Sequence, residues 1–253
     1  MLDCNPISTL LDPNQKLTKS QCPTETADIE EMSQKPYMQA VGSLLFAAQL
    51  TRPDIAYAVN MLSRFGTNPG KSHWAAVKRV LRYVKGTIDK RLTYQKEHSE
   101  VEGYCDADHA GNLDTAQTTT GYVFLLQGGA VSWASKLQKR ITLSTTESEF
   151  VAMVASSKEA TWLKGLQREI FPSTPKLTIL YCDNKGAENK ANNNSYSDAT
   201  KHVLIKLKYL HQRIKNKELK LVHVSSDEMI ADALTKGLPK IKLEYFSKKF
   251  RLN

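Results

Sequence analysis

Apolar residues recur at helical spacing in the first third of the chain and at strand spacing after it. Between residues 37 and 85 they repeat every three or four positions, which is the period of an amphipathic helix. Pro53 suits the first turn of such a helix. The pattern therefore predicts three helices, over residues 37–50, 53–65 and 72–85, followed by a short strand at 92–95.

From residue 101 onward, short apolar runs alternate with longer amphipathic stretches. The short runs predict strands at residues 101–106, 122–127, 130–135, 140–143, 177–182 and 219–224. The longer stretches predict helices at residues 144–167, 184–192 and 201–217, and a last helix that begins at 229. Gly128-Gly129 indicates a hairpin turn. A hairpin followed by βα units predicts a mixed sheet with helices packed on it.

The 253 residues suffice for one large or two modest domains. Residues 1–35 are polar and rich in proline, so we expect an extended lead-in there, followed by a helical region over 36–98. A charged linker then precedes a second domain over 101–240 and a tail over 241–253. The chain has neither a membrane-spanning apolar stretch nor a secretory signal, so we expect no membrane partner.

Composition and charge distribution narrow the classes of function that the protein can have. Hydrophobic residues make up 41% and charged residues 24% of the chain, which excludes a disordered or fibrous protein. The net charge is +9, and residues 201–253 hold 13 basic and 5 acidic residues. A basic flank beside a slightly acidic middle suits a nuclease, because cations hold phosphates and carboxylates hold metal. A merely soluble basic protein is the alternative.

Four acidic residues stand in similar local contexts. Asp106 and Asp183 each end a predicted strand in the tripeptide Tyr-Cys-Asp, whereas Glu147 and Asp232 begin predicted helices. If the two strands are parallel neighbours, their carboxyl ends meet at one edge of the sheet. Crowded carboxylates repel each other, and hard divalent cations such as Mg²⁺ remove that repulsion. Two such ions would support an in-line phosphoryl displacement.

Each acid also has a structural reading. Aspartate is common where strands end, and Ser144-x-x-Glu147 is a capping box that would only satisfy the start of a helix. Asp108 shares a strand face with Asp106, and Glu149 lies about 200° from Glu147 around the helix. Only one of the two glutamates can therefore face the metal.

The cysteines and histidines add no metal site. Cys4, Cys22, Cys105 and Cys182 are too far apart in sequence for a zinc motif, and we expect reduced thiols. Because side chains alternate along a strand, Cys105 and Cys182 should be buried neighbours on the face opposite the aspartates. His223 is interpreted as a structural residue.

The region 101–240 resembles the ribonuclease H domain of Ty1/copia-type LTR-retrotransposon Pol polyproteins. The matching stretches include GYCDADHAG (103–111), LSTTESEFVAM (143–153), YCDNKGA (181–187) and HVSSDEMIADALTKGLP (223–239). Residues 35–65 and 78–87 resemble the end of the reverse transcriptase region of the same polyproteins, namely its thumb or connection.

The resemblance implies a ribonuclease-H-like mixed five-stranded sheet flanked by helices, and hydrolysis of the RNA strand of RNA–DNA hybrids. It further implies two Mg²⁺ ions, with Mn²⁺ as a substitute, held by Asp106, Glu147, Asp183 and Asp232. Glu147 is preferred to Glu149 because Thr146-Glu147 matches the family's Thr-Glu. The expected partners are the RNA–DNA hybrid and the reverse transcriptase domain of the same polyprotein. The expected location is inside the cell, either in virus-like particles in the cytoplasm or in the nucleus.

Such an enzyme reads the shape and backbone of its substrate, including the RNA 2′-hydroxyls. The candidate contacts lie near the predicted catalytic elements, and solvated surface positions are the alternative for each of them. They are Lys136, Lys139, Arg140, Asn184, Lys201, Lys206 and Lys208. Two other functions compete with the nuclease: a transposon-derived fragment that binds nucleic acid without cutting it, and an integrase-like DNA nuclease.

Overall fold

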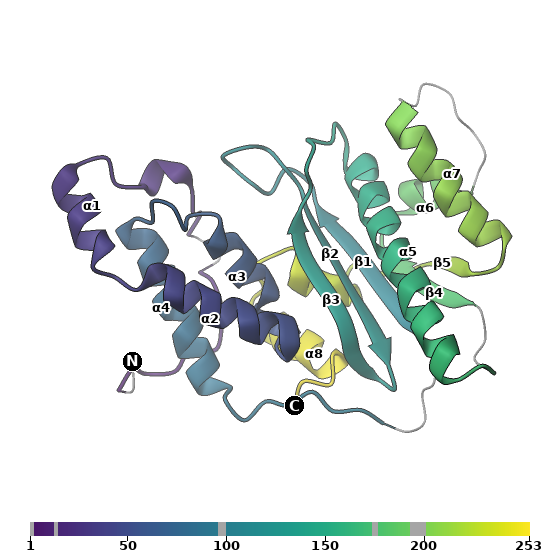
Figure 1. The fold of residues 1–253 in the computed structure, drawn as a ribbon, viewed down its shortest axis with the longest axis horizontal. Coiled ribbons are helices and arrows are strands. Elements are labelled where there is room, and N and C mark those ends of the chain that lie inside the picture. Colours follow the sequence, from purple (N-terminus) through teal and green to yellow (C-terminus); the bar gives the residue numbers. More distant parts are fainter. Residues whose placement is uncertain (1–2, 13–14, 96–99, 174–176, 193–200) are drawn as a thin grey trace. The chain divides into compact units, whose positions relative to one another are not determined.

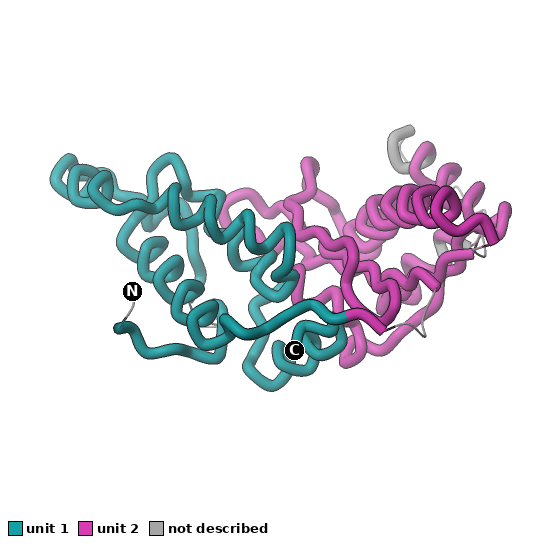
Figure 2. The backbone as a smooth tube through the Cα atoms, turned by 60° about the horizontal axis from the view of Figure 1, so that its bottom comes forward, with its two compact units in different colours: residues 1–93, 236–253 teal, residues 94–235 magenta. Residues whose placement is uncertain are grey.

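The computed structural model describes residues 3–12, 15–95, 100–173, 177–192 and 201–253. The chain forms two compact units (Figure 2). Unit 1 comprises residues 1–93 and 236–253, and unit 2 comprises residues 94–235. Among the helices within these described ranges, none combines the length and the apolar character needed to cross a bilayer.

Unit 2 is built on a five-stranded sheet with the strand order β3-β2-β1-β4-β5 (Figure 1). The strands are β1 (Glu102–Asp108), β2 (Thr119–Leu126), β3 (Gly129–Leu137), β4 (Thr178–Cys182) and β5 (Leu219–His223). β1, β2 and β3 pair antiparallel, whereas β4 lies parallel between β1 and β5. The expected ribonuclease-H-like mixed sheet is confirmed, with the Tyr-Cys-Asp strands β1 and β4 as parallel neighbours.

The hairpin between β2 and β3 turns one residue earlier than Gly128-Gly129 suggests. Gln127 and Gly128 have φ angles of 54° and 73°, so both central residues of the two-residue turn are left-handed. That is the type I′ turn, whose twist matches the flanking strands. Gly129 therefore already pairs with Leu126 in the ladder.

The strand expected at residues 140–143 is absent from this described segment, which is a loop. Thr142 is buried, and its hydroxyl hydrogen-bonds that of Thr118 at 3.2 Å. Gln138 anchors the start of the loop, because its amide donates to the Ser148 carbonyl at 3.0 Å. Side-chain bonds thus replace a strand ladder here.

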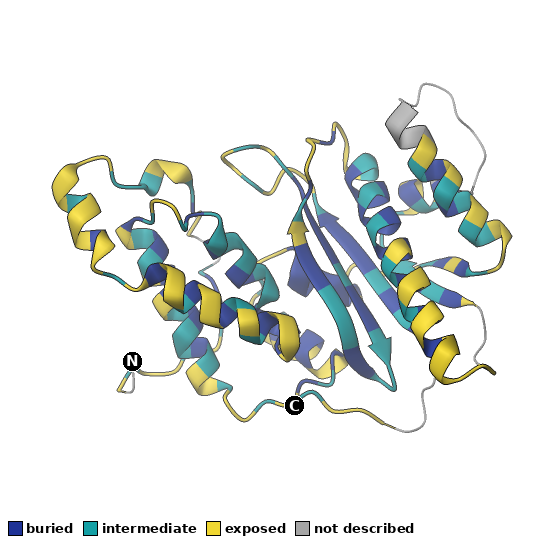
Figure 3. Ribbon diagram, in the orientation of Figure 1, coloured by how far each residue is buried: buried dark blue, intermediate teal, exposed yellow. Residues whose placement is uncertain are grey.

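Helices cover the sheet of unit 2 on both faces. α5 (Thr145–Ile170), α6 (Lys185–Asn192) and α7 (Lys201–Lys215) are the α-helices of this unit, and η3 (Ile230–Leu234) is a short 3-10 helix (Figure 1). Cys105 and Leu180 share an apolar cluster with Met153 of α5. Because side chains alternate along β1, Asp106 points to the other face, against η3. Figure 3 shows that most of the sheet is buried or half-buried, whereas α5 and α7 each have exposed residues.

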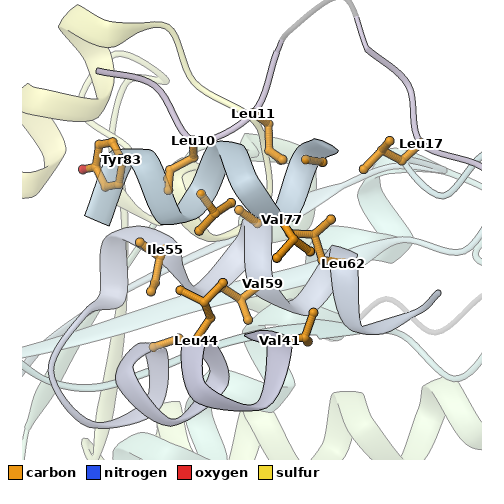
Figure 4. Packing of buried hydrophobic residues seen from close by; sticks show 14 of the residues in the cluster. Leu10, Leu11, Leu17, Val41, Leu44, Ile55, Val59, Leu62, Val77 and Tyr83 are labelled. Carbon is orange, nitrogen blue, oxygen red and sulfur yellow. The ribbon is translucent and has the colours of Figure 1, made fainter. Parts of the chain in front are cut away.

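Unit 1 is helical, and its predicted helices are confirmed. Its elements are η1 (Lys19–Gln21), α1 (Thr26–Ser33), α2 (Tyr37–Leu50), η2 (Pro53–Ile55), α3 (Ala56–Ser63), α4 (Lys71–Gly86) and α8 (Lys240–Lys249). One apolar face each of α2, α3 and α4 meets in a common core (Figure 4). The period of the apolar residues decides this packing.

Both ends of the chain belong to unit 1. The expectation was a separate lead-in over residues 1–35, a second domain up to residue 240 and a separate tail over 241–253. Leu10, Leu11 and Leu17 are buried in the core of unit 1, and so is Leu243 of α8 (Figure 4). The last residues pair with the segment where a strand was expected, in a single bridge between Leu92 and Leu252. The apolar side chains within the polar ends are what hold them to the core.

Candidate metal centre

Three carboxylates converge at the end of β1 and β4. Asp106 lies on β1, Glu149 lies near the start of α5 and Asp183 follows β4 directly. Each offers an oxygen, and the three oxygens all lie within 4.8 Å of one another. Parallel pairing of β1 with β4 brings the aspartates to one edge of the sheet, as the repeated tripeptide predicts.

Asp106 is held in place by its surroundings. Its side chain is only 1% exposed, and the hydroxyl of Thr235, just after η3, donates to its Oδ2. The close approach of η3 depends on Gly121, the β2 partner of Asp106. A Cβ at Gly121 would lie 2.6 Å from the Thr235 methyl and 2.9 Å from Leu234 Cβ. A glycine at this position therefore lets η3 press against the strand beside Asp106.

Glu149 has a strongly raised pKa. Burial raises its pKa to about 9, and the neighbouring charges of Asp106 and Asp183 add to this effect. Oε1 accepts a hydrogen bond of 3.3 Å from the backbone N–H of Ala107. Oε2 is buried and has no hydrogen-bond partner. A carboxyl group with a pKa this high keeps a proton at neutral pH, and a bound cation would take the place of that proton.

Glu147 does not join the aspartates, which corrects the expectation that it, rather than Glu149, faces them. Its Oε2 accepts a hydrogen bond of 2.9 Å from the backbone N–H of Leu143. Its own N–H donates to the hydroxyl of the N-cap residue Ser144 at 3.2 Å. Glu147 thus serves the start of α5, as the capping box in the sequence indicates. Two residues later, the helix turns Glu149 inward.

Asp183 and Asn184 have separate contacts. Asp183 is partly exposed, and its Oδ2 accepts a hydrogen bond of 2.9 Å from the Ser226 hydroxyl. The Asn184 side-chain oxygen accepts from the backbone N–H of Ala187 at 2.9 Å and so caps α6. The oxygen of Asn184 is therefore committed to the helix, although its amide nitrogen has no such role.

Asp232 and Asp108 lie outside the group of three. Asp232 is 3% exposed on η3, which packs against β1 and β2 and also carries Thr235 at its end. Asp108 accepts a hydrogen bond from the backbone N–H of Thr119 at the end of the β1–β2 ladder. Asp232 is thus on the element that contacts Asp106, whereas Asp108 closes the hairpin.

The donor set fits a hard divalent cation. Three carboxylates offer oxygen atoms only, and Mg²⁺ and Mn²⁺ prefer oxygen ligands. The raised pKa of Glu149 comes first from burial and then from the charges of Asp106 and Asp183, so ionised Glu149 lacks compensating positive charge and is repelled by the aspartates. A cation among the three oxygens would remove this repulsion.

The expected nucleic-acid contacts are dispersed over several elements. Lys136 on β3, Lys139 and Arg140 in the following loop and Lys208 on α7 are exposed. The Lys206 side chain is half-buried, and burial lowers its pKa, with smaller contributions from the charges of Arg140 and Lys158. The charges of Arg140 and Lys206 therefore influence each other. The side chains of Lys201 and His202 lie outside those that the structure describes.

Cys105 and Cys182 are free and buried on adjacent strands, as expected. The Cys105 thiol donates to the Tyr181 carbonyl at 3.6 Å. Burial raises the pKa of both thiols, so they are unreactive parts of the core. His223 is exposed at the end of β5.

Sequence reasoning considered Glu149 but preferred Glu147, and it missed Thr235 and Ser226. The capping box at Ser144 assigns Glu147 to the start of the helix. That signal favours Glu149 as the glutamate that faces the metal. Nothing in the sequence marks Thr235 and Ser226, because their contacts to Asp106 and Asp183 span 129 and 43 residues.

The chain is similar to a part of larger polyproteins. It is 42% identical over 244 residues to the retrovirus-related Pol polyprotein from transposon TNT 1-94 of Nicotiana tabacum, covering 96% of the chain and 18% of that protein. It is 36% identical to the Pol polyprotein from transposon RE2 of Arabidopsis thaliana, covering 98% of the chain and 17% of that protein. The chain therefore spans less than a fifth of these relatives.

Among solved structures, LC11-RNase H1 isolated from compost matches with a TM-score of 0.42 and 15% identity. That match covers 54% of this chain and 93% of the other. No family model matches the sequence.

Proposed function

The chain belongs to the Pol polyproteins of Ty1/copia-type LTR retrotransposons, and from that premise we propose that unit 2 is a metal-dependent ribonuclease H. Its reaction is hydrolysis of the RNA strand of an RNA–DNA hybrid. The observation that carries the proposal is the convergence of Asp106, Glu149 and Asp183 within 4.8 Å. Buried acids gathered at the carboxyl ends of parallel strands suit metal-assisted phosphoryl chemistry.

In this proposal, Asp106, Glu149 and Asp183 hold two Mg²⁺ ions, with Asp232 as a fourth carboxylate and Mn²⁺ as a substitute. The chemistry that such ions would supply there is activation of water and stabilisation of the charge of the scissile phosphate. The hydroxyls of Thr235 and Ser226 fix the orientations of Asp106 and Asp183. Glu149 gives up its proton when it becomes a ligand, because only the carboxylate binds metal.

The substrate is held mainly through its backbone. Lysine and arginine side chains neutralise phosphates without regard to sequence, and RNA is distinguished by its 2′-hydroxyls. Arg140 and Lys206 are the pair that supports this role best, since their charges influence each other. Unit 1 is the end of the reverse transcriptase region in this scheme, and the preceding reverse transcriptase domain is the natural partner.

The decisive experiment is an Mg²⁺-dependent cleavage assay on a labelled RNA–DNA hybrid, with duplex RNA and duplex DNA as controls. Asp183→Asn should reduce hybrid cleavage to background and leave hybrid affinity nearly unchanged, because lysines supply most of the grip. Glu169→Gln removes the same charge from an exposed position on α5 and should cleave like wild type.

Unchanged cleavage by Asp183→Asn would refute the assignment. A wild-type protein that binds the hybrid tightly but never cuts it would instead support the alternative of a nucleic-acid-binding fragment without catalysis.

A further inference from the structure

A cavity lies in unit 2, at the opposite end of α5 from the carboxylates. Its volume is about 250 Å³, and it is lined by the C-terminal half of α5, the end of α7 and the start of β5. Figure 1 shows α7 turning back into β5 beside α5. Lys164 lines the cavity and lies 15 residues beyond Glu149 on α5. At 1.5 Å per residue that is about 22 Å along the helix, so the cavity is separate from the metal centre.

The charged residues that line the cavity are mostly cations. They are Lys164, Arg168, Arg213 and Glu218. The carboxylate of Glu218 is already paired, because its Oε2 lies 2.6 Å from Nη1 of Arg213. Within the described parts of the chain, neither Lys164 nor Arg168 forms an ion pair. The three cations and the one carboxylate of the lining therefore leave a net charge of +2 at the cavity.

Lys164 is the unusual member of this set. Only 6% of the residue is exposed, and its ammonium donates to a neutral acceptor, Gln167 Oε1, at 3.1 Å. Burial lowers the pKa of Lys164, and the charge of Glu100 offsets this only in part. A buried cation normally has a partner of opposite charge, because desolvation is otherwise uncompensated. The buried Nε of Arg213 also has no acceptor.

We propose that this cavity binds a phosphate group. A phosphate offers several acceptor oxygens and no obligatory donor, which matches cavity walls that present unpaired N–H groups. Its negative charge, about −1 in a phosphodiester and between about −1 and −2 in a free phosphate or monoester, offsets the charges of Lys164 and Arg168. A volume of about 250 Å³ is below the roughly 300–1,000 Å³ of sites for drug-sized ligands. The site therefore takes one phosphate group and not a whole nucleotide.

The proposal is independent of the nuclease assignment, and phosphate titration of the 253-residue chain tests it. Binding is measured by calorimetry and by thermal unfolding, with sodium chloride at equal ionic strength as the reference. Inorganic phosphate should raise the melting temperature of wild type above the chloride reference. Lys164→Met should weaken phosphate binding about tenfold or more, the worth of one hydrogen bond to a charged group. Arg168→Gln, at an exposed position, should weaken it to a lesser extent.

Lys220→Met is the matched control, because Lys220 is exposed on β5 and does not line the cavity. It should bind phosphate like wild type. The proposal is overturned if phosphate acts on wild type no differently from chloride, or if both Lys164→Met and Arg168→Gln keep wild-type affinity. Because Arg168 is exposed, the second variant remains informative even if the first fails to fold.

The phosphate can belong to a free anion or to a nucleic-acid backbone, and a competition arm separates the two. Wild type and Lys164→Met are each allowed to bind the RNA–DNA hybrid in EDTA, which prevents cleavage. Phosphate is then added, and displacement of the hybrid is measured. Displacement that depends on Lys164 would identify a backbone phosphate as the ligand. Displacement that is equal in both proteins would identify a free phosphate or phosphoester.

Discussion

Glu147 and Glu149, two residues apart in α5, differ in function because the helix turns about 200° between them. The side chain of Glu147 bonds back to the Leu143 backbone, whereas Glu149 reaches Ala107 on β1 and the two aspartates. Glu147 therefore stabilises the start of α5, whereas Glu149 is available to the metal centre.

Exchange of each glutamate for glutamine separates these two roles. Glu149→Gln should abolish Mg²⁺-dependent hybrid cleavage, because a neutral amide is a poor ligand for a hard cation. Glu147→Gln should keep most of the activity and lose about 0.5–1 kcal/mol of folding stability, the range of a helix cap. Cleavage assays and urea unfolding of both variants measure this, and an inactive Glu147→Gln beside an active Glu149→Gln would contradict it.

The raised pKa of Glu149 also predicts how stability depends on pH without divalent metal. In the unfolded chain a glutamate ionises near pH 4.3, whereas folded Glu149 keeps its proton up to about 9. The folded state then binds more protons between these values, so the free energy of unfolding falls as pH rises, by at most about 1.4 kcal/mol per pH unit.

The pH series is run in EDTA by chemical unfolding between pH 5 and pH 9. Glu149→Gln should remove this part of the slope, and saturating Mg²⁺ should counteract it. A wild-type slope equal to that of Glu149→Gln would mean that Glu149 ionises normally in the folded protein.

At the scale of elements, the contact of η3 with the β1–β2 pair orders the metal centre. Gly121 provides the space, Thr235 bonds Asp106, and Asp232 lies within η3 itself. β4 brings Asp183 by parallel pairing with β1. The site therefore depends on packing between elements as much as on its acidic residues.

Gly121→Ala should push η3 away from the sheet. The new methyl would lie 2.6 Å from Thr235 Cγ2 and 3.0 Å from the Ala231 carbonyl oxygen, and neither belongs to a long flexible side chain. We expect a loss of about 1–3 kcal/mol of stability from overpacking and a marked loss of cleavage at saturating Mg²⁺.

Gly42→Ala is the control, since a Cβ at this exposed helical position meets nothing within 4 Å. It should raise stability by about 0.5–1 kcal/mol and leave cleavage unchanged. Wild-type stability and activity for Gly121→Ala would show that η3 has more room than its contacts indicate.

At the scale of the whole molecule, the two ends of the sequence complete one unit. Residues 1–93 form a core that also contains α8, from the last 18 residues. Backbone bonds between Arg91 and Asn253, at 2.6 and 3.1 Å, join the end of the chain to the segment after α4. The core of unit 1 is therefore complete only with residues from both ends of the chain.

Two adjacent aromatic residues of α8 test this dependence. Phe246 is fully buried, so Phe246→Ala should cost about 3–5 kcal/mol of stability in unit 1. Tyr245 is 38% exposed, and Tyr245→Ala should cost much less. Limited proteolysis within residues 3–93, read by mass spectrometry, should speed up only for Phe246→Ala. Equal protection in the two variants would show that α8 does not support this core.

Periodicity and local motifs determined the helices of unit 1, the mixed sheet and the two aspartates that follow parallel strands. These features depend on spacing along the chain, which the order of residues contains directly. Only the tertiary structure decided that Glu149 faces the aspartates, that Thr235 orients Asp106 and that α8 belongs with the N-terminal helices. Those outcomes depend on which distant elements pack together. The capping box at Ser144 only indicates which glutamate is left over, whereas the partner that this glutamate meets is set by the packing of α5 against β1.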